Sequence, residues 1–95
     1  MDAPTFSEFE QAARREGYDE IVPRDWPAAA VLETHEHPFA VKAIVVDGEM
    51  WLTHDGKTRH LQAGDRFELD EGVPHAERYG TAGVTYWAAR RHPKR

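Results

Sequence analysis

Two short stretches carry three of the six histidines of the chain: Thr34-His35-Glu36-His37-Pro38 and Gly72-Val73-Pro74-His75. Successive side chains of a β-strand alternate between its two faces, so His35 and His37 would project from the same side. The Gly-x-Pro turn before His75 would start another strand and bring a third imidazole to the same place. Three neutral imidazoles that converge within β-structure form a ligand set for Zn, Fe, Ni, Cu or Mn.

The length, charge and composition of the chain exclude several classes of protein and of functional site. Its 95 residues suffice for one domain with one core. A formal net charge of −5 argues against a nucleic-acid partner. Cysteine is absent, so a metal must use nitrogen and oxygen ligands. No apolar run approaches the roughly 20 residues of a membrane span, and the start, Met1-Asp2-Ala3-Pro4, lacks the pattern of a signal peptide. We therefore expect a cytoplasmic protein.

One helix is predicted, over residues 5–16. Thr5-x-x-Glu8 is a capping box, Phe6, Phe9 and Ala13 recur at helical spacing, and Gly17 suits the residue that ends a helix. We expect its apolar stripe to cover the outside of a sheet.

Short β-like runs begin after residue 27 and are separated by turn signals such as Asp47-Gly48, Asp55-Gly56 and Gly80-Thr81-Ala82-Gly83. The predicted strands are residues 28–37, 41–46, 49–54, 57–61, 66–69, 73–79 and 84–89. This spacing is typical of an all-β sandwich or barrel. We divide the chain into residues 1–27 (the helix and a lead-in strand), residues 28–90 (the barrel) and residues 91–95 (a basic tail).

The stretch from His35 to Tyr79 resembles the cupin superfamily, in which a small β-barrel carries two sequence motifs. The first motif is His-x-His, three or four residues, Glu, about six residues, Gly. The second is Gly, five residues, Pro-x-Gly, two residues, His, three residues, Asn. The matching positions are His35, His37, Gly48, Gly64, Gly72 and His75, with Asp70 at the Pro position and Tyr79 at the Asn position. The resemblance implies a jelly-roll barrel whose mouth holds the histidines, and a short N-terminal α-helix completes the predicted fold.

The sequence departs from the family at one ligand position. The glutamate of the first motif is replaced by Val41, or by Lys42 if four residues are counted. Val41 shares the inward parity of His35 and His37. The chain therefore looks like a three-histidine variant that holds a divalent ion (Zn, Fe, Ni or Mn) through His35, His37 and His75, and a cupin that has lost its metal is the alternative.

Two carboxylates have the parity to approach these histidines. Glu77 and Tyr79 follow His75 on the same strand face, so Glu77 is a candidate fourth ligand, hydrogen-bond partner of an imidazole or general base. The alternative places Glu77 at the rim, in water. We name Glu77 and Tyr79 as candidate catalytic residues. Glu33, two residues before His35, is a weaker candidate for the same roles as Glu77.

Parity and composition also suggest the walls of a pocket for a small organic molecule. The candidates include Glu33, Val41, Met50, Phe67 and Tyr86. For each apolar candidate, the alternative is that the side chain packs in the barrel core and does not line a pocket. Outward apolar residues such as Leu32, Ile44 and Val46 need cover, which the helix and a second copy of the chain would supply. We expect a homodimer, as is common among cupins.

Three functions fit this sequence. The first is a metal-dependent enzyme, for which the resemblance implies dioxygenase, isomerase, cyclase or lyase chemistry. The second is a non-catalytic module that binds or senses a small molecule, with or without metal. The third is a structural metal with a closed shell, for example with Glu77 as fourth ligand. We favour the enzyme over the binding module. The remaining histidines, His54, His60 and His92, are expected to face solvent.

Overall fold

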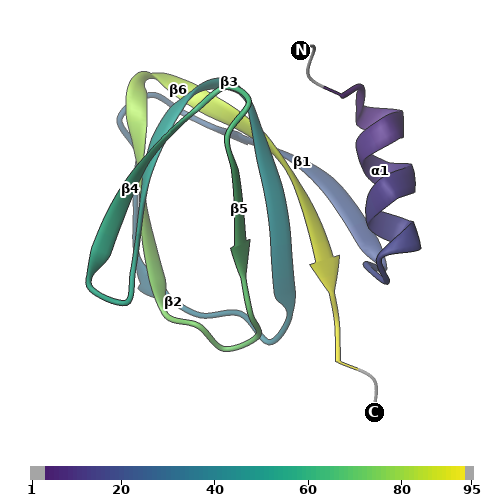
Figure 1. Ribbon diagram of the computed structural model, residues 1–95. Helices are drawn as coiled ribbons and strands as arrows, with labels where there is room; N and C mark the ends of the chain where they lie inside the picture. Colours follow the sequence, from purple (N-terminus) through teal and green to yellow (C-terminus); the bar gives the residue numbers. More distant parts are fainter. Residues whose placement is uncertain (1–3, 94–95) are drawn as a thin grey trace.

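Two long, bent strands form the frame of the molecule in the computed structural model, which describes residues 4–93. They are β3 (Ala40–His54) and β6 (His75–Arg91), and they pair antiparallel along most of their length (Figure 1). The other elements described are α1 (Phe6–Arg15), β1 (Glu20–Trp26), β2 (Val31–His35), β4 (Lys57–Gln62) and β5 (Arg66–Leu69).

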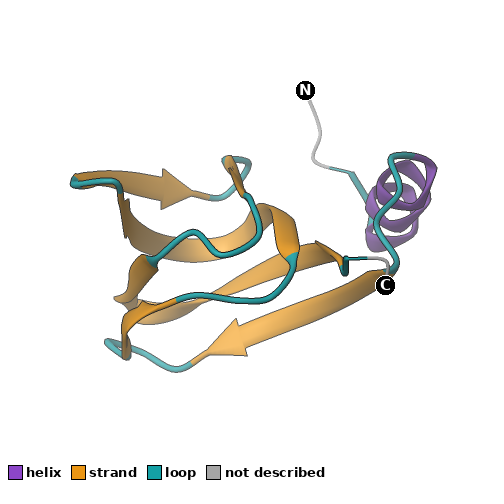
Figure 2. Ribbon diagram, turned by 90° about the horizontal axis from the view of Figure 1, so that it is seen from below, coloured by secondary structure: helices purple, strands orange, loops and turns teal. Residues whose placement is uncertain are grey.

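Each long strand carries a different short partner on each of its two halves. β2 pairs with the first half of β6 and β1 with the second half, whereas β5 pairs with the first half of β3 and β4 with the second half. All these pairings are antiparallel. The strands curve around one interior, as Figure 2 shows from below. The predicted all-β barrel with an N-terminal helix is confirmed.

Two of the predicted turns are bends within a strand, which corrects the predicted division into short strands. The chain continues through Asp47-Gly48 in β3 and through residues 80–83 in β6. The register of β3 on β6 shifts between Val45 and Asp47 and again between Gly48 and Met50. Such bulges let a strand bend sharply without ending. β1 likewise continues through Pro23, because as an edge strand it pairs on one side only.

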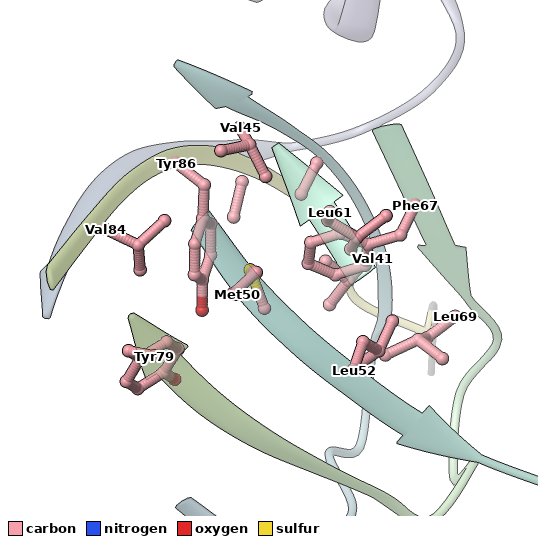
Figure 3. Close-up of a cluster of buried hydrophobic side chains, with 12 residues drawn as sticks. Val41, Val45, Met50, Leu52, Leu61, Phe67, Leu69, Tyr79, Val84 and Tyr86 are labelled. Carbon is pink, nitrogen blue, oxygen red and sulfur yellow. The ribbon is translucent and has the colours of Figure 1, made fainter. Parts of the chain in front are cut away.

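The barrel interior is filled by alternate residues of the strands (Figure 3). The largest buried side chains of this core are Val41, Val45, Met50, Leu52, Leu61, Phe67, Leu69, Tyr79, Val84 and Tyr86. The predicted pocket residues Val41, Met50, Phe67 and Tyr86 are all among them, so their side chains fill the interior. These four side chains therefore leave little room for a ligand within the core itself.

The helix covers an apolar patch on the outside of the sheet. The Thr5 hydroxyl accepts from the Glu8 backbone N–H (3.1 Å), and the Glu8 carboxylate accepts from the Thr5 N–H (2.8 Å), so the predicted capping box is present. Phe9 and Ala13 pack on Ile44 and Ala89. The helix therefore covers Ile44, one of the outward apolar side chains that were predicted to need cover.

The other predictions about chain organisation have mixed outcomes. No helix within residues 4–93 is long and apolar enough to cross a membrane. The division at residues 27 and 90 stays a prediction; β1 lies in the first segment and pairs with β6. Residues 1–3, used in the signal-peptide prediction, and residues 94–95 of the predicted tail lie outside the described part of the chain.

Candidate metal centre

Three histidines meet where β2 ends and β6 begins. His35, the last residue of β2, pairs in register with His75, the first residue of β6. His37 follows in the loop toward β3, and its carbonyl accepts a hydrogen bond from the Gly72 N–H (2.9 Å), which ties that loop to the turn before His75. One donor atom from each of the three imidazoles can be chosen so that all lie within 4.8 Å of one another. The three histidines are thus positioned to bind a metal, as predicted.

Backbone carbonyls fix the orientation of two of the rings. Nδ1 of His35 lies 2.7 Å from the Glu33 carbonyl oxygen, and Nδ1 of His75 lies 2.9 Å from the Val73 carbonyl oxygen. A carbonyl only accepts, so Nδ1 of each ring is the hydrogen-bond donor and Nε2 is the nitrogen that the neutral ring would offer to a metal. Metal-binding histidines are commonly oriented in this way.

The donor set fits a metal ion on a further observation. Nε2 of His35 is buried and has no hydrogen-bond partner among residues 4–93. A buried polar atom without a partner is costly, and a metal ion would satisfy this lone pair. Three imidazole nitrogens without thiolates suit the divalent ions Zn, Fe, Ni or Mn.

His37 is held in the neutral form that metal binding requires. Burial, followed by the positive charges on His35 and His75 when protonated and on Arg90 and Arg24, lowers the pKa of His37 to about 4. The His37 ring also stacks on Phe39, with ring centroids 4.8 Å apart.

Glu77 is a buried carboxylate beside the histidines, with only 5% of its surface exposed. Its Oε2 lies 3.6 Å from Nε2 of His75. Its Oε1 accepts hydrogen bonds from the hydroxyls of Tyr79 (2.8 Å) and Tyr86 (3.2 Å), and Figure 3 shows the Tyr86 hydroxyl on the side toward Tyr79. Burial and the nearby Glu77 charge raise the pKa of both tyrosines, so both hydroxyls stay protonated.

The carboxylate missing from the first motif is not replaced at the same position. Val41 points into the barrel core, whereas Lys42 points outward and its Nζ lies 2.7 Å from the Glu16 carboxylate at the end of α1. Lys42 therefore places no positive charge beside the three histidines. Glu77 is the buried acid near them, and it comes from a different strand.

Glu33 lies apart from this buried cluster, contrary to the parity argument. The register of β2 on β6 shifts by one residue between Leu32, which pairs with Glu77, and His35, which pairs with His75. The alternation of faces therefore does not carry from His35 back to Glu33. The Glu33 side chain is exposed, and its backbone carbonyl is the group that serves His35.

The other histidines stay outside the cluster. His60 is exposed and pairs with Glu49, and His92 pairs with Asp19. His54 is partly buried next to the β3–β4 turn. Trp26 was not among the predicted site residues, but its indole N–H donates to the Tyr86 hydroxyl (3.2 Å) and its ring stacks on Tyr79. Trp26 shares a strand face with the apolar residue Val22, and this spacing could have indicated that Trp26 also faces the core.

Comparison with known proteins decides the family. The sequence model described as the cupin domain matches residues 24–85, which is more than half of the chain. The chain belongs to the cupin family. No curated protein matches the cupin sequence at a significant level.

Solved cupin structures share the fold. A cupin domain from Schizosaccharomyces pombe superposes with a TM-score of 0.71 at 13% identity, over 77% of this chain and 52% of its own. An RmlC-like cupin from Shewanella frigidimarina gives 0.69 at 24% identity, over 82% of this chain and 70% of its own. The DMSP lyase DddQ from Ruegeria pomeroyi gives 0.65 at 26% identity, over 75% and 36%. The chain thus spans about half of the first structure and about a third of the lyase.

Proposed function

We propose that this cupin holds one divalent metal ion through His35, His37 and His75 and binds a small organic molecule at the mouth of the barrel. The observation that carries the proposal is the lone pair of His35 Nε2, which is buried without a partner on a ring that belongs to a cluster of three imidazoles. No hydrogen bond among residues 4–93 accounts for that atom, and a metal ion would.

The three histidines supply three of the ligands of such a centre and leave room for a molecule from solution. When bound, an ion of this class supplies Lewis-acid or oxygen-activating chemistry. The Nδ1–H bonds of His35 and His75 to backbone carbonyls fix the orientation of the two rings that would hold the ion. The low pKa of His37 keeps that ring unprotonated and able to ligate.

Glu77 and Tyr79 are the groups that would handle protons in an enzymatic reaction. Oε1 of Glu77 is occupied by two tyrosine hydroxyls, while Oε2 faces His75 and stays free of the tyrosines. Oε2 is therefore the atom that would accept a proton from a bound molecule. In the alternative role, as a fourth ligand, Oε2 of Glu77 would bind the metal ion together with the three histidines.

We place a metal-dependent enzyme ahead of a binding or sensing module. A buried carboxylate that keeps one oxygen free beside the three histidines supports this order, because binding alone does not need a proton acceptor. The structural likeness to the DMSP lyase at 26% identity also supports it. The reaction would be of the dioxygenase, isomerase, cyclase or lyase type.

We further propose a homodimer. Val31 on the outside of β2 is 64% exposed, and it borders a hollow shared with Trp51 and Arg78 on the same outer side of the sheet. Burial of this apolar residue against a second copy would remove it from water. Sedimentation at several protein concentrations would test the oligomeric state.

The direct test is elemental analysis of protein purified without a histidine tag or chelator, followed by metal add-back. We expect about one metal ion per chain in the wild type and in His60→Ala, a matched control outside the cluster, and loss of the ion in His75→Ala. Full metal retention in a folded His75→Ala protein would refute the proposal. Metal bound in the wild type with no turnover of any organic substrate would favour the binding module.

A further inference from the structure

Arg24 lies on the inner side of β1. It pairs in register with Tyr86, and its neighbours on the same strand face, Val22 and Trp26, both pack against the barrel core. The Arg24 guanidinium lies over the Trp26 ring, 4.9 Å from its centroid. The Trp26 ring in turn stacks on Tyr79, with centroids 5.2 Å apart. One indole ring thus separates Arg24 from the hydroxyl groups that hold Glu77.

A second arginine lies near the histidines, but its charge is already paired. The Arg90 guanidinium lies 5.0 Å from the centroid of Phe39, which stacks on His37. Arg90 also forms an ion pair with Glu20 (3.3 Å). The Arg24 side chain, by contrast, has no ion pair or hydrogen bond with any group in residues 4–93, although it is partly buried. Arg24 is therefore a cation on the inner face without a direct ion-pair or hydrogen-bond partner in the described part of the chain.

A chain of short contacts links Arg24 to the histidines. The Trp26 ring that contacts Arg24 also stacks on Tyr79, and the Tyr79 hydroxyl donates to Oε1 of Glu77 (2.8 Å). Oε2 of Glu77 lies 3.6 Å from Nε2 of His75. Arg24 thus contacts the side-chain network that adjoins the three imidazoles.

We propose that Arg24 binds the carboxylate of the small organic molecule, so that the substrate or ligand class is a small organic acid. This inference rests on the proposed function, because it concerns the molecule that the metal centre would receive. A planar guanidinium matches a carboxylate with two parallel hydrogen bonds. A single guanidinium without a direct polar partner matches a single carboxylate group. Trp26 and Phe39 beside the two arginines would contact the apolar part of the molecule.

The test is an NMR titration of 15N-labelled protein with butyrate and with its neutral isostere butyramide, in metal-free and metal-loaded samples. The Trp26 indole N–H and the Arg24 Nε–H signals report on the site. We expect both signals to shift with butyrate, and butyrate to bind about tenfold or more tightly than butyramide. Arg24→Gln should raise the Kd for butyrate by about tenfold or more and leave the Kd for butyramide unchanged.

Two further variants complete the design. Arg24→Lys keeps the charge without the planar fork, so its Kd for butyrate should lie between those of the wild type and Arg24→Gln. Arg15→Gln, on the exposed end of α1, makes the same change in net charge far from the mouth and should bind butyrate like the wild type. The amide spectrum shows directly whether each variant is folded.

Two results would overturn the inference: an equal Kd for butyrate in the wild type and in folded Arg24→Gln, or no preference of the wild type for butyrate over butyramide. Failure of the proposed function has a different signature. In that case the wild type binds no metal on add-back, while the titration of the metal-free sample still shows whether Arg24 selects the carboxylate.

Discussion

The two oxygens of the Glu77 carboxylate have different environments, and this difference is the chemical basis of the proposed site. Tyr79 and Tyr86 donate to Oε1, while Oε2 faces His75. The two hydroxyls fix the carboxylate plane, and therefore the direction in which Oε2 points. Tyr86 in turn accepts from the Trp26 indole N–H, so three side chains from two strands hold one acid in place.

Removal of one hydroxyl from this network should cost stability. Tyr86→Phe takes one donor from Glu77 and the acceptor from the Trp26 N–H, and we expect the free energy of unfolding to fall by about 1–3 kcal/mol. Urea denaturation of metal-free protein would measure the change. Tyr18→Phe is the control, because the Tyr18 hydroxyl lies outside this network. An equal loss in both variants would contradict the assigned role of the network.

The pKa of His37 leads to a prediction about pH. His37 has a pKa of about 4 in the folded protein, below the ordinary value of 6.5, so the unfolded chain binds a proton that the folded chain does not. The free energy of unfolding of the metal-free protein should therefore fall as the pH is lowered from about 6.5 to about 4. The same denaturation series on His37→Gln should show a flatter slope, because other acid-sensitive groups are common to both proteins. Identical slopes would contradict the low pKa.

Single residues were the most predictable part of the site. The spacing of His35 and His37 is a local strand feature, and the approach of His75 from a distant strand was expected from the resemblance to the two cupin motifs. Glu33 was placed by the same parity rule, which fails there because a bulge against β6 shifts the register. Arg24 and Trp26 were missed, because their relation to Tyr79 and Tyr86 depends on which strand β1 pairs with.

At the level of elements, the two bends of β3 and β6 create the barrel. Gly48 in β3 lies against the backbone of Gly83 in β6, so closely that a Cβ on Gly48 would overlap the Gly83 carbonyl. Gly83 in turn lies against the Trp26 carbonyl at the end of β1. Glycine-containing dipeptides predicted turns at these places, because a local pattern does not distinguish a turn from a bend whose partner is distant in sequence.

Two glycine variants separate this close approach from simple backbone strain. Gly48 and Gly56 have similar positive φ angles of 79° and 72°, but a Cβ on Gly56 would meet nothing within 4 Å. Gly56→Ala should therefore cost about 1–2 kcal/mol of unfolding free energy for the strained φ alone. Gly48→Ala should cost about 1–3 kcal/mol more, because the strands must move apart. Thermal or urea denaturation would compare them, and equal losses would show that the two strands do not approach so closely.

At the level of the whole molecule, the barrel, the helix and the metal centre occupy different places and have different tasks. The interior is closed by apolar side chains, the helix covers one outer patch, and the three histidines lie where two strand ends meet. The barrel could be predicted because two motifs resemble those of the cupin family, and the helix because its capping box is a local signal. Oligomeric state, metal identity and reaction type depend on molecules beyond this chain, and sequence patterns alone do not specify them.

X-ray absorption spectroscopy of the metal-loaded protein tests the central claim most directly, because it reports the atoms bound to the ion. We predict three imidazole nitrogens in the first coordination shell, at about 2.0–2.1 Å if the metal is zinc. His60→Ala should give the same spectrum, and His35→Ala should lose the imidazole signal together with tight binding. A shell made mainly of oxygen atoms, or an unchanged spectrum in folded His35→Ala, would contradict a metal centre built from His35, His37 and His75.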